Sequence, residues 1–215
     1  ALIWVDISGG HHRLGGTALA QCYNQLGNVS PDLDEPQLLV KAFNVTQQLI
    51  KDRLLTAGHD ISDGGLITCI LEMAFAGNCG MDINFNTSKN SVSVTELLFS
   101  EELGLIIEAQ EENVDSVIKS YKSQNVPCHI IGSSQGQGQS AKVCVSVDDK
   151  KVLEEKTTEL RRIWEETSFR LERLQSNPQC VEEEETNFGN RTAPLYKMSF
   201  DPSVMPAILK NLSSK

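Results

Sequence analysis

The chain has little positive charge. Its 215 residues include 19 Lys and Arg against 29 Asp and Glu, so the formal net charge is -10. A protein that binds nucleic acid without sequence preference usually presents a clustered basic face to the phosphates. The sequence contains no such cluster, and we therefore expect no nucleic-acid partner.

A long apolar run is also missing. Residues 66–75 form one of the longest apolar stretches, but Thr68, Cys69 and Glu72 interrupt it. A membrane-spanning helix needs about 20 consecutive apolar residues. We therefore expect no membrane partner, and a soluble chain whose 40% hydrophobic residues form one core.

The six cysteines include no CxxC pair, which is the spacing typical of zinc sites and redox motifs. Three of them lie in apolar segments, where a reduced thiol packs as a small hydrophobic group. This pattern favours a cytoplasmic protein. A secreted glycoprotein is the alternative, because the sequence has five Asn-x-Ser/Thr sequons. They begin at Asn28, Asn44, Asn86, Asn190 and Asn211.

Hydrophobic periodicity predicts an α+β fold, with a mixed β-sheet and helices packed on it. The expected strands lie at residues 2–7, 81–85, 105–109, 127–132 and 141–147. The expected helices lie at residues 35–57, 66–76, 94–99, 112–123 and 158–174.

Three local patterns complete the expected organisation. The long helix should bury a stripe formed by Leu39, Phe43, Ile50 and Leu54. The polar residues 133–140 predict a hairpin connection between two strands. Periodicity fades after residue 177, and four Glu residues follow at 182–185. We therefore expect one domain over residues 1–175 and an acidic, poorly structured linker over residues 176–215.

Residues 59–66 read HDISDGGL and lie between two of the expected helices. The first amides of a helix lack partners within it and attract anions. Gly64 and Gly65 would let a phosphate approach the backbone, while Asp60 or Asp63 could share a Mg²⁺ with its oxygens and Ser62 could donate a hydrogen bond. A capped turn, in which Asp63 accepts backbone N–H bonds, explains the same residues. The residues alone leave both interpretations open.

Two other patterns carry weaker signals. Gly15, Gly16 and Thr17 precede a short helical stretch, which suits phosphate binding but is better explained by close backbone packing. Glu101 and Glu102 could be metal ligands or acid–base groups, although such a pair more often lies in a solvated turn.

Five motifs in the same order resemble one enzyme family. They are LGGTALAQ at residues 14–21, HDISDGGL at 59–66, EMAFAGN at 72–78, LFSEE at 98–102 and WEETSF at 164–169. Together they resemble phosphoribosylformylglycinamidine synthase in its large single-chain form, over about residues 2–184. The resemblance implies the second of two aminoimidazole ribonucleotide (AIR) synthase-like C-terminal domains, just ahead of a glutaminase domain.

The family converts formylglycinamide ribonucleotide, glutamine and ATP to formylglycinamidine ribonucleotide in purine synthesis, with Mg²⁺ offsetting the charge of the transferring phosphoryl group. The resemblance therefore implies a nucleotide and a phosphoribosyl substrate as partners, together with preceding synthetase domains and a following glutaminase domain of the same chain. These residues contain neither the partner nucleotide-binding half nor the glutaminase. We expect the piece by itself to be inactive.

Carried over to this sequence, the family's metal ligand falls on Asp60 and its nucleotide contact on Ser62. Gly64 and Gly65 would lie beside the phosphates, and Asp63 would be a structural cap. The nucleotide, ATP or ADP, could be a reactant or a structural ADP that never turns over. The resemblance assigns no catalytic residue here. A non-catalytic docking module of a related ATP-binding synthetase or kinase is the alternative.

Overall fold

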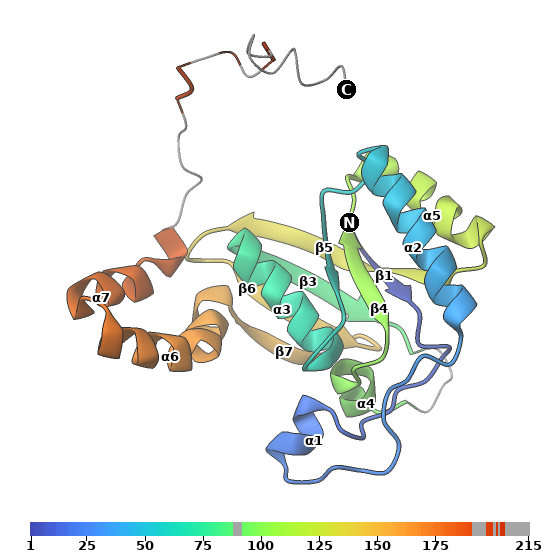
Figure 1. The fold of residues 1–215 in the computed structure, drawn as a ribbon, viewed down its shortest axis with the longest axis horizontal. Helices are drawn as coiled ribbons and strands as arrows, with labels where there is room; N and C mark the ends of the chain where they lie inside the picture. Colours follow the sequence, from blue (N-terminus) through green and yellow to red (C-terminus); the bar gives the residue numbers. More distant parts are fainter. Residues whose placement is uncertain (88–91, 191–196, 200, 202, 205–215) are drawn as a thin grey trace, which may run out of the picture.

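The computed structural model describes residues 1–87, 92–190, 197–199, 201 and 203–204. Its centre is a seven-stranded sheet in the order β2-β4-β1-β5-β3-β6-β7 (Figure 1). Neighbouring strands run antiparallel except β3 and β6, which run parallel. The expected α+β fold with a mixed sheet is therefore confirmed. The strands are β1 (Leu2–Asp6), β2 (Ala57–Asp60), β3 (Cys79–Phe85), β4 (Gly104–Glu108), β5 (Cys128–Gln137), β6 (Lys142–Val147) and β7 (Lys150–Lys156).

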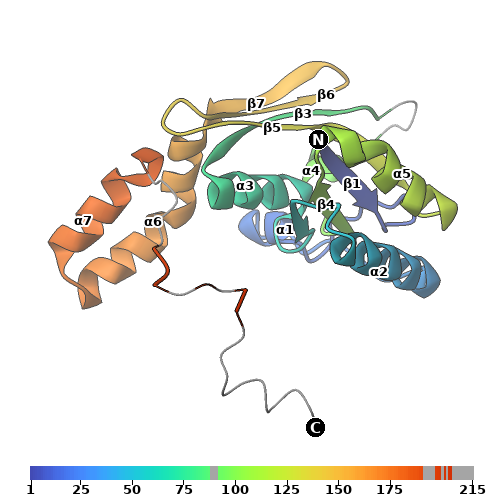
Figure 2. The same cartoon turned by 90° about the horizontal axis from the view of Figure 1, so that it is seen from above.

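Helices cover both faces of the centre of the sheet. Consecutive strand residues point to opposite faces. Ile106 of β4 belongs to the core cluster that includes α3, and its neighbour Ile107 belongs to the cluster that includes α2 and α5. Figure 2 shows α6 and α7 at the opposite end of the molecule from α2 and α5. The helices are α1 (Ala18–Cys22), α2 (Pro36–Lys51), α3 (Gly65–Gly77), α4 (Val94–Phe99), α5 (Val114–Ser123), α6 (Thr157–Gln175) and α7 (Pro178–Thr186), with short 3₁₀ turns at Glu111–Asn113 and Phe188–Asn190.

The helix expected at residues 35–57 is wrong at its C-terminal end. The helix α2 stops at Lys51, and Arg53 adopts a left-handed backbone with φ +56°. Ala57–Asp60 instead forms the edge strand β2, which pairs with β4. Pairing with a strand far along the chain thus overrides the helical spacing of this segment.

The buried stripe predicted for the long helix is wrong at Phe43 and Ile50, although Leu39 and Leu54 do pack against the core. The helix buries Leu38, Ala42 and Leu49, so its inner face is shifted by one residue. Phe43 and Ile50 lie on the outer side and are 59% and 54% exposed. The apolar residues on this helix therefore occupy two faces, and their spacing alone does not show which face is buried.

The hairpin expected at residues 133–140 is not formed. The strand β5 continues to Gln137, and β3 lies between β5 and β6. The strand β7 was not expected, because Lys150–Lys156 holds only two apolar residues among five charged ones. It is an exposed edge strand that pairs with β6.

The segment expected to be a poorly structured linker contains the helix α7. Val181 of this helix packs against Phe169 of α6, and both side chains are buried. The expectation of little structure is therefore wrong for residues 178–190. Residues 191–196, 200, 202 and 205–215 lie outside the described residues, as does the sequon at Asn211. The division into a domain and a linker stays a prediction.

None of the helices in the described ranges combines the length and the apolar character needed to cross a lipid bilayer.

Candidate functional site

The candidate site is the turn from β2 into α3, at residues 60–65. Asp60 is the last residue of the edge strand, and its side chain is 71% exposed. Ser62 and Asp63 are exposed, whereas Ile61 between them is buried. The turn therefore joins a strand to a helix, which corrects the expectation that it lies between two helices. Asp60 and Ser62 both reach solvent from the same turn.

The two glycines of this turn are required by its geometry. Gly64 and Gly65 have φ values of +84° and +75°, a region that residues with a Cβ rarely adopt. A Cβ on Gly64 would collide with Thr68 of α3, and one on Gly65 would lie 2.7 Å from the carbonyl oxygen of Ser100. The start of α3 is thus packed directly against the backbone that follows α4.

The amides of both glycines donate to acceptors within the protein. Gly65 N–H donates to the carbonyl oxygen of Ser62 at 3.0 Å. Gly64 N–H donates to Oε1 of Glu101 at 2.7 Å. Gly64 is itself the N-cap of α3, with no side-chain capping bond. The carboxylate at this turn is that of Glu101, so the predicted capping role of Asp63 is wrong.

His59 and Glu72 border the turn on the side of β2. His59 Nε2 lies 3.0 Å from a carboxylate oxygen of Glu72, and His59 Nδ1 lies 2.7 Å from the carbonyl oxygen of Asp60. Burial, together with the negative charges of Asp60 and Glu72, raises the pKa of the Cys69 thiol to about 12. This side of the site is therefore electronegative, and a cation would offset its charge.

The donor set at Asp60 fits one kind of metal binding and not another. In the part of the chain that the structure describes, no group of three or more His, Cys, Asp or Glu is arranged to hold a metal ion. A protein-only cage is therefore not formed by these residues. Mg²⁺ usually keeps several waters and takes only one or two carboxylates together with substrate phosphates. One exposed carboxylate beside a hydroxyl suits that arrangement.

Ser100, Glu101 and Glu102, here called the acidic turn, connect α4 to β4. Glu102 is only 4% exposed. Its carboxylate accepts from Arg13 Nε at 2.6 Å and from Arg13 Nη2 at 2.8 Å, and Arg13 N–H adds a bond of 3.0 Å. This contact raises the pKa of Arg13 above its ordinary value. Glu101 and Glu102 therefore do not form the solvated turn that is usual for such a pair.

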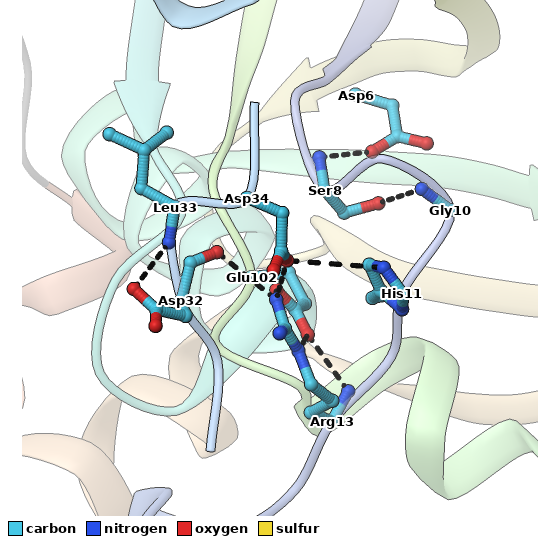
Figure 3. Close-up of polar contacts among 9 residues, drawn as sticks. All are labelled: Asp6, Ser8, Gly10, His11, Arg13, Asp32, Leu33, Asp34 and Glu102. Carbon is cyan, nitrogen blue, oxygen red and sulfur yellow. Dashed lines mark hydrogen bonds and ion pairs between the residues drawn. The ribbon is translucent and has the colours of Figure 1, made fainter. Parts of the chain in front are cut away.

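Arg13 extends this network to the long loop that follows α1. Its guanidinium donates to Asp34 Oδ2 at 2.6 Å and to the carbonyl oxygen of Asp32 at 3.0 Å (Figure 3). The bidentate pair with Glu102 is of a kind that ranks among the stronger polar contacts in proteins. The bonds of Arg13 to Glu102, Asp32 and Asp34 hold the segment that contains α1, residues 13–34, against the acidic turn.

In the second glycine pair, Gly15 is closely packed as the sequence suggested, whereas Gly16 has open space at its Cβ position. A Cβ on Gly15 would collide with the backbone of Val29. Thr17 caps α1 by accepting from Ala20 N–H, and its hydroxyl donates to the carbonyl oxygen of Leu14 at 2.7 Å. Ala18 N–H donates to Oε1 of Glu101 at 2.8 Å. Close packing at Gly15 is thus confirmed, and the acidic turn again supplies the anion.

The structure has one hollow beside the candidate site and another away from it. One of about 370 Å³ borders His59 and Asp60 and has apolar walls that include Ile50 and Leu105. Another of about 450 Å³ lies elsewhere, and its lining includes Trp4 and His129 but none of residues 60–65. Sequence reasoning missed the second hollow, because its residues come from separate strands with no shared motif.

The fold and the site define a class of domain. Residues 2–144 match the model of the family described as AIR synthase related protein, C-terminal domain, and the chain belongs to that family. Its relatives are more specific. A human phosphoribosylformylglycinamidine synthase is 53% identical over 195 residues, covering 91% of this chain and 14% of the relative. A probable chloroplastic or mitochondrial phosphoribosylformylglycinamidine synthase of Arabidopsis thaliana is 47% identical over 202 residues, covering 94% and 14%.

The resemblance to the synthase family is therefore confirmed, while this chain spans only about a seventh of the length of these relatives. Among solved structures, PurL of T. maritima complexed with ATP has a TM-score of 0.56 at 13% identity, covering 74% of this chain and 25% of PurL. The same protein complexed with FGAR has a TM-score of 0.57 at 14% identity, covering 74% and 27%. At this identity the likeness concerns the fold, which is AIR synthase-like.

Proposed function

We propose that this chain is a domain of an ATP-dependent amidoligase that converts formylglycinamide ribonucleotide and glutamine to formylglycinamidine ribonucleotide in purine biosynthesis. The observation that carries the proposal is 53% identity to the human synthase across 91% of the chain. The complete enzyme would hold preceding synthetase domains and a following glutaminase domain as partners in the same polypeptide, and it would work in the cytoplasm.

Within that enzyme, the domain contributes a Mg²⁺–nucleotide site built on Asp60 and Ser62. The exposed Asp60 carboxylate would hold Mg²⁺, which offsets the charge of the phosphates, and the Ser62 hydroxyl would donate to a phosphate oxygen. PurL of T. maritima has been solved with ATP and with ADP, which supports a nucleotide as the ligand. The electronegative surroundings of His59 and Glu72 support a cation at this place.

A glycine pair at the start of a helix suggests backbone amides that bind a phosphate, but the role of Gly64 and Gly65 is different. Both amides already donate within the protein, so we propose that these glycines shape the turn beside the phosphates. The direct contacts are left to the exposed side chains of Asp60 and Ser62. This arrangement suits a fixed, structural ADP as well as a reactant, and it keeps a purely docking role as the second candidate function.

Titration of Mg·ADP into the full-length enzyme by calorimetry tests the site. Asp60→Ala should remove one nucleotide from the stoichiometry, whereas the matched control Asp63→Ala should leave it unchanged. An unchanged stoichiometry in Asp60→Ala would contradict the nucleotide site and favour the docking role. The isolated 215-residue chain should be inactive and bind Mg·ADP with a Kd of about 1 mM or weaker. Low-micromolar binding by the isolated chain would contradict a site completed by other domains.

A further inference from the structure

One oxygen atom of Glu101 connects two glycine turns that are far apart in the sequence. Its Oε1 accepts from Gly64 N–H at 2.7 Å and from Ala18 N–H at 2.8 Å. Gly64 opens α3, and Ala18 is the first residue of α1. The donors lie 37 and 83 positions from Glu101. A single carboxylate therefore joins three segments of the chain.

These are the two turns that resemble phosphate-binding turns in the sequence. Amides at the start of a helix have no partner within the helix and carry partial positive charge. A carboxylate that accepts from two of them meets the same need as a bound phosphate would. Here the anion is the carboxylate of Glu101, so the amides of Gly64 and Ala18 are both hydrogen-bonded within the protein.

The surroundings of Glu101 hold its carboxylate in this position. The backbone of Ser100 packs on Gly65, where a Cβ would lie 2.7 Å from the Ser100 carbonyl oxygen. On the other side, Glu102 is buried and bonded to Arg13 through both carboxylate oxygens. The chain on each side of Glu101 is therefore fixed, and its side chain extends from a rigid base.

We propose that Glu101 is a positioning residue, a built-in anion that holds the α1 turn and the α3 turn together and thereby orients Asp60 and Ser62. The orientation of a ligand by those two residues rests on the proposed function. The bridge between the turns does not. Glu101 itself touches neither metal nor nucleotide in this scheme, and its bridging oxygen is used by two backbone hydrogen bonds.

The substitutions Glu101→Gln and Glu101→Ala in the full-length protein separate this role from direct ligation. Gln keeps a side-chain oxygen that accepts both N–H groups, but it loses the negative charge that makes a carboxylate a strong Mg²⁺ ligand. Ala removes the acceptor. Hydrogen–deuterium exchange measures the bridge, and calorimetric titration with Mg·ADP measures its consequence for the site.

In Glu101→Ala, exchange should rise about tenfold or more at Ala18 and Gly64 together, since losing one charge-assisted bond is worth about that factor. Affinity for Mg·ADP should fall by about tenfold at unchanged stoichiometry, and Glu101→Gln should restore both readouts to within about threefold. Exchange that rises at one turn only, or at neither, would overturn the bridge. A Gln variant that loses as much nucleotide affinity as Ala would show direct ligation instead.

The substitution Ala18→Pro provides a second route if Glu101→Ala does not fold. Proline is accommodated at the first position of a helix, and the preceding Thr17 already has the extended backbone (ψ 161°) that proline favours. This variant removes one donor and leaves Glu101 intact. Faster exchange at Gly64 is expected, and unchanged exchange there would reject the bridge. Failure of the nucleotide site would appear separately, as an Asp60→Ala variant with unchanged stoichiometry.

Discussion

Glutamate side chains have different roles in the acidic turn and in the helical arm formed by α6 and α7. Glu102 of the turn is 4% exposed and bonded to Arg13, whereas Glu166 of the arm is 55% exposed and pairs with Arg170 one helical turn away. The turn joins distant segments, while the pair on the arm stays within one helix. Glu102 thus helps to determine tertiary structure at the site, whereas Glu166 lies on the surface of the arm.

The largest expected effect is that of Glu102→Ala. The substitution removes the buried carboxylate of Glu102 and leaves the partly buried Arg13 without its main partner, which costs up to about 3–5 kcal/mol. Urea unfolding of the variant should show this loss at an unchanged slope. A loss below about 1 kcal/mol would mean that the acidic turn behaves like the arm, and the contrast between the two regions would be broken.

Gly65→Ala should come next, at roughly 2–4 kcal/mol, because overpacking and a left-handed backbone both oppose the new methyl group. Gly16→Ala is the matched control. Gly16 has a similar φ of +76° but open space around its Cβ position, so only the backbone contribution of about 1–2 kcal/mol applies. Equal losses in the two variants, measured by thermal unfolding, would show that packing against the acidic turn contributes nothing.

The thiols of the two regions should also differ. Cys69 is buried beneath the site, and burial is the largest of the causes that raise its pKa from 9.0 to about 12. The folded state therefore favours the neutral thiol, and the resulting stability is complete below pH 9 and lost as the pH rises from 9 towards 12. At pH 10 the loss should be about 1.4 kcal/mol relative to Cys69→Ala.

Stability of both proteins measured between pH 8 and pH 10 checks this difference. Cys180 of α7 is exposed, so the native protein should alkylate there while Cys69 stays unmodified. Parallel pH profiles for the wild type and Cys69→Ala, or alkylation of native Cys69 at pH 8, would contradict the prediction.

The smallest effect is expected on the arm. A double-mutant cycle of Glu166→Ala and Arg170→Ala should give a coupling energy below about 0.5 kcal/mol, since solvent screens an exposed pair one helical turn apart. Added salt should reduce the coupling further. A coupling above about 1.5 kcal/mol would place this pair with those of the acidic turn.

The elements that the sequence predicts well are those with a clear local period. The core strand at Leu2–Asp6 and the apolar helix Gly65–Gly77 follow from their own residues. The strand β2 does not, because Ala57–Asp60 has no apolar alternation and becomes a strand only through pairing with β4. Two apolar faces on α2 likewise left its buried side open to error.

The residues of the candidate site stay a prediction, and the sequence did not predict their connections. The HDISDGGL motif marks Asp60 and Ser62, and the structure places both at the exposed turn. The partner of Gly64 is 37 positions away and the partner of Glu102 is 89 positions away. Local spacing cannot reveal such pairs, since they depend on how the sheet brings three loops together.

The place of the first strand in the sheet has a consequence for synthesis on the ribosome. Leu2 lies between Glu108 and Gly132, its partners on the two neighbouring strands. The strand β1 therefore waits for about a hundred further residues before its partner β4 has been made. Until then the apolar sides of α2 and α3 have no complete sheet to cover them. We therefore expect a nascent chain that stalls before β5 to expose apolar surface, to aggregate and to bind chaperones.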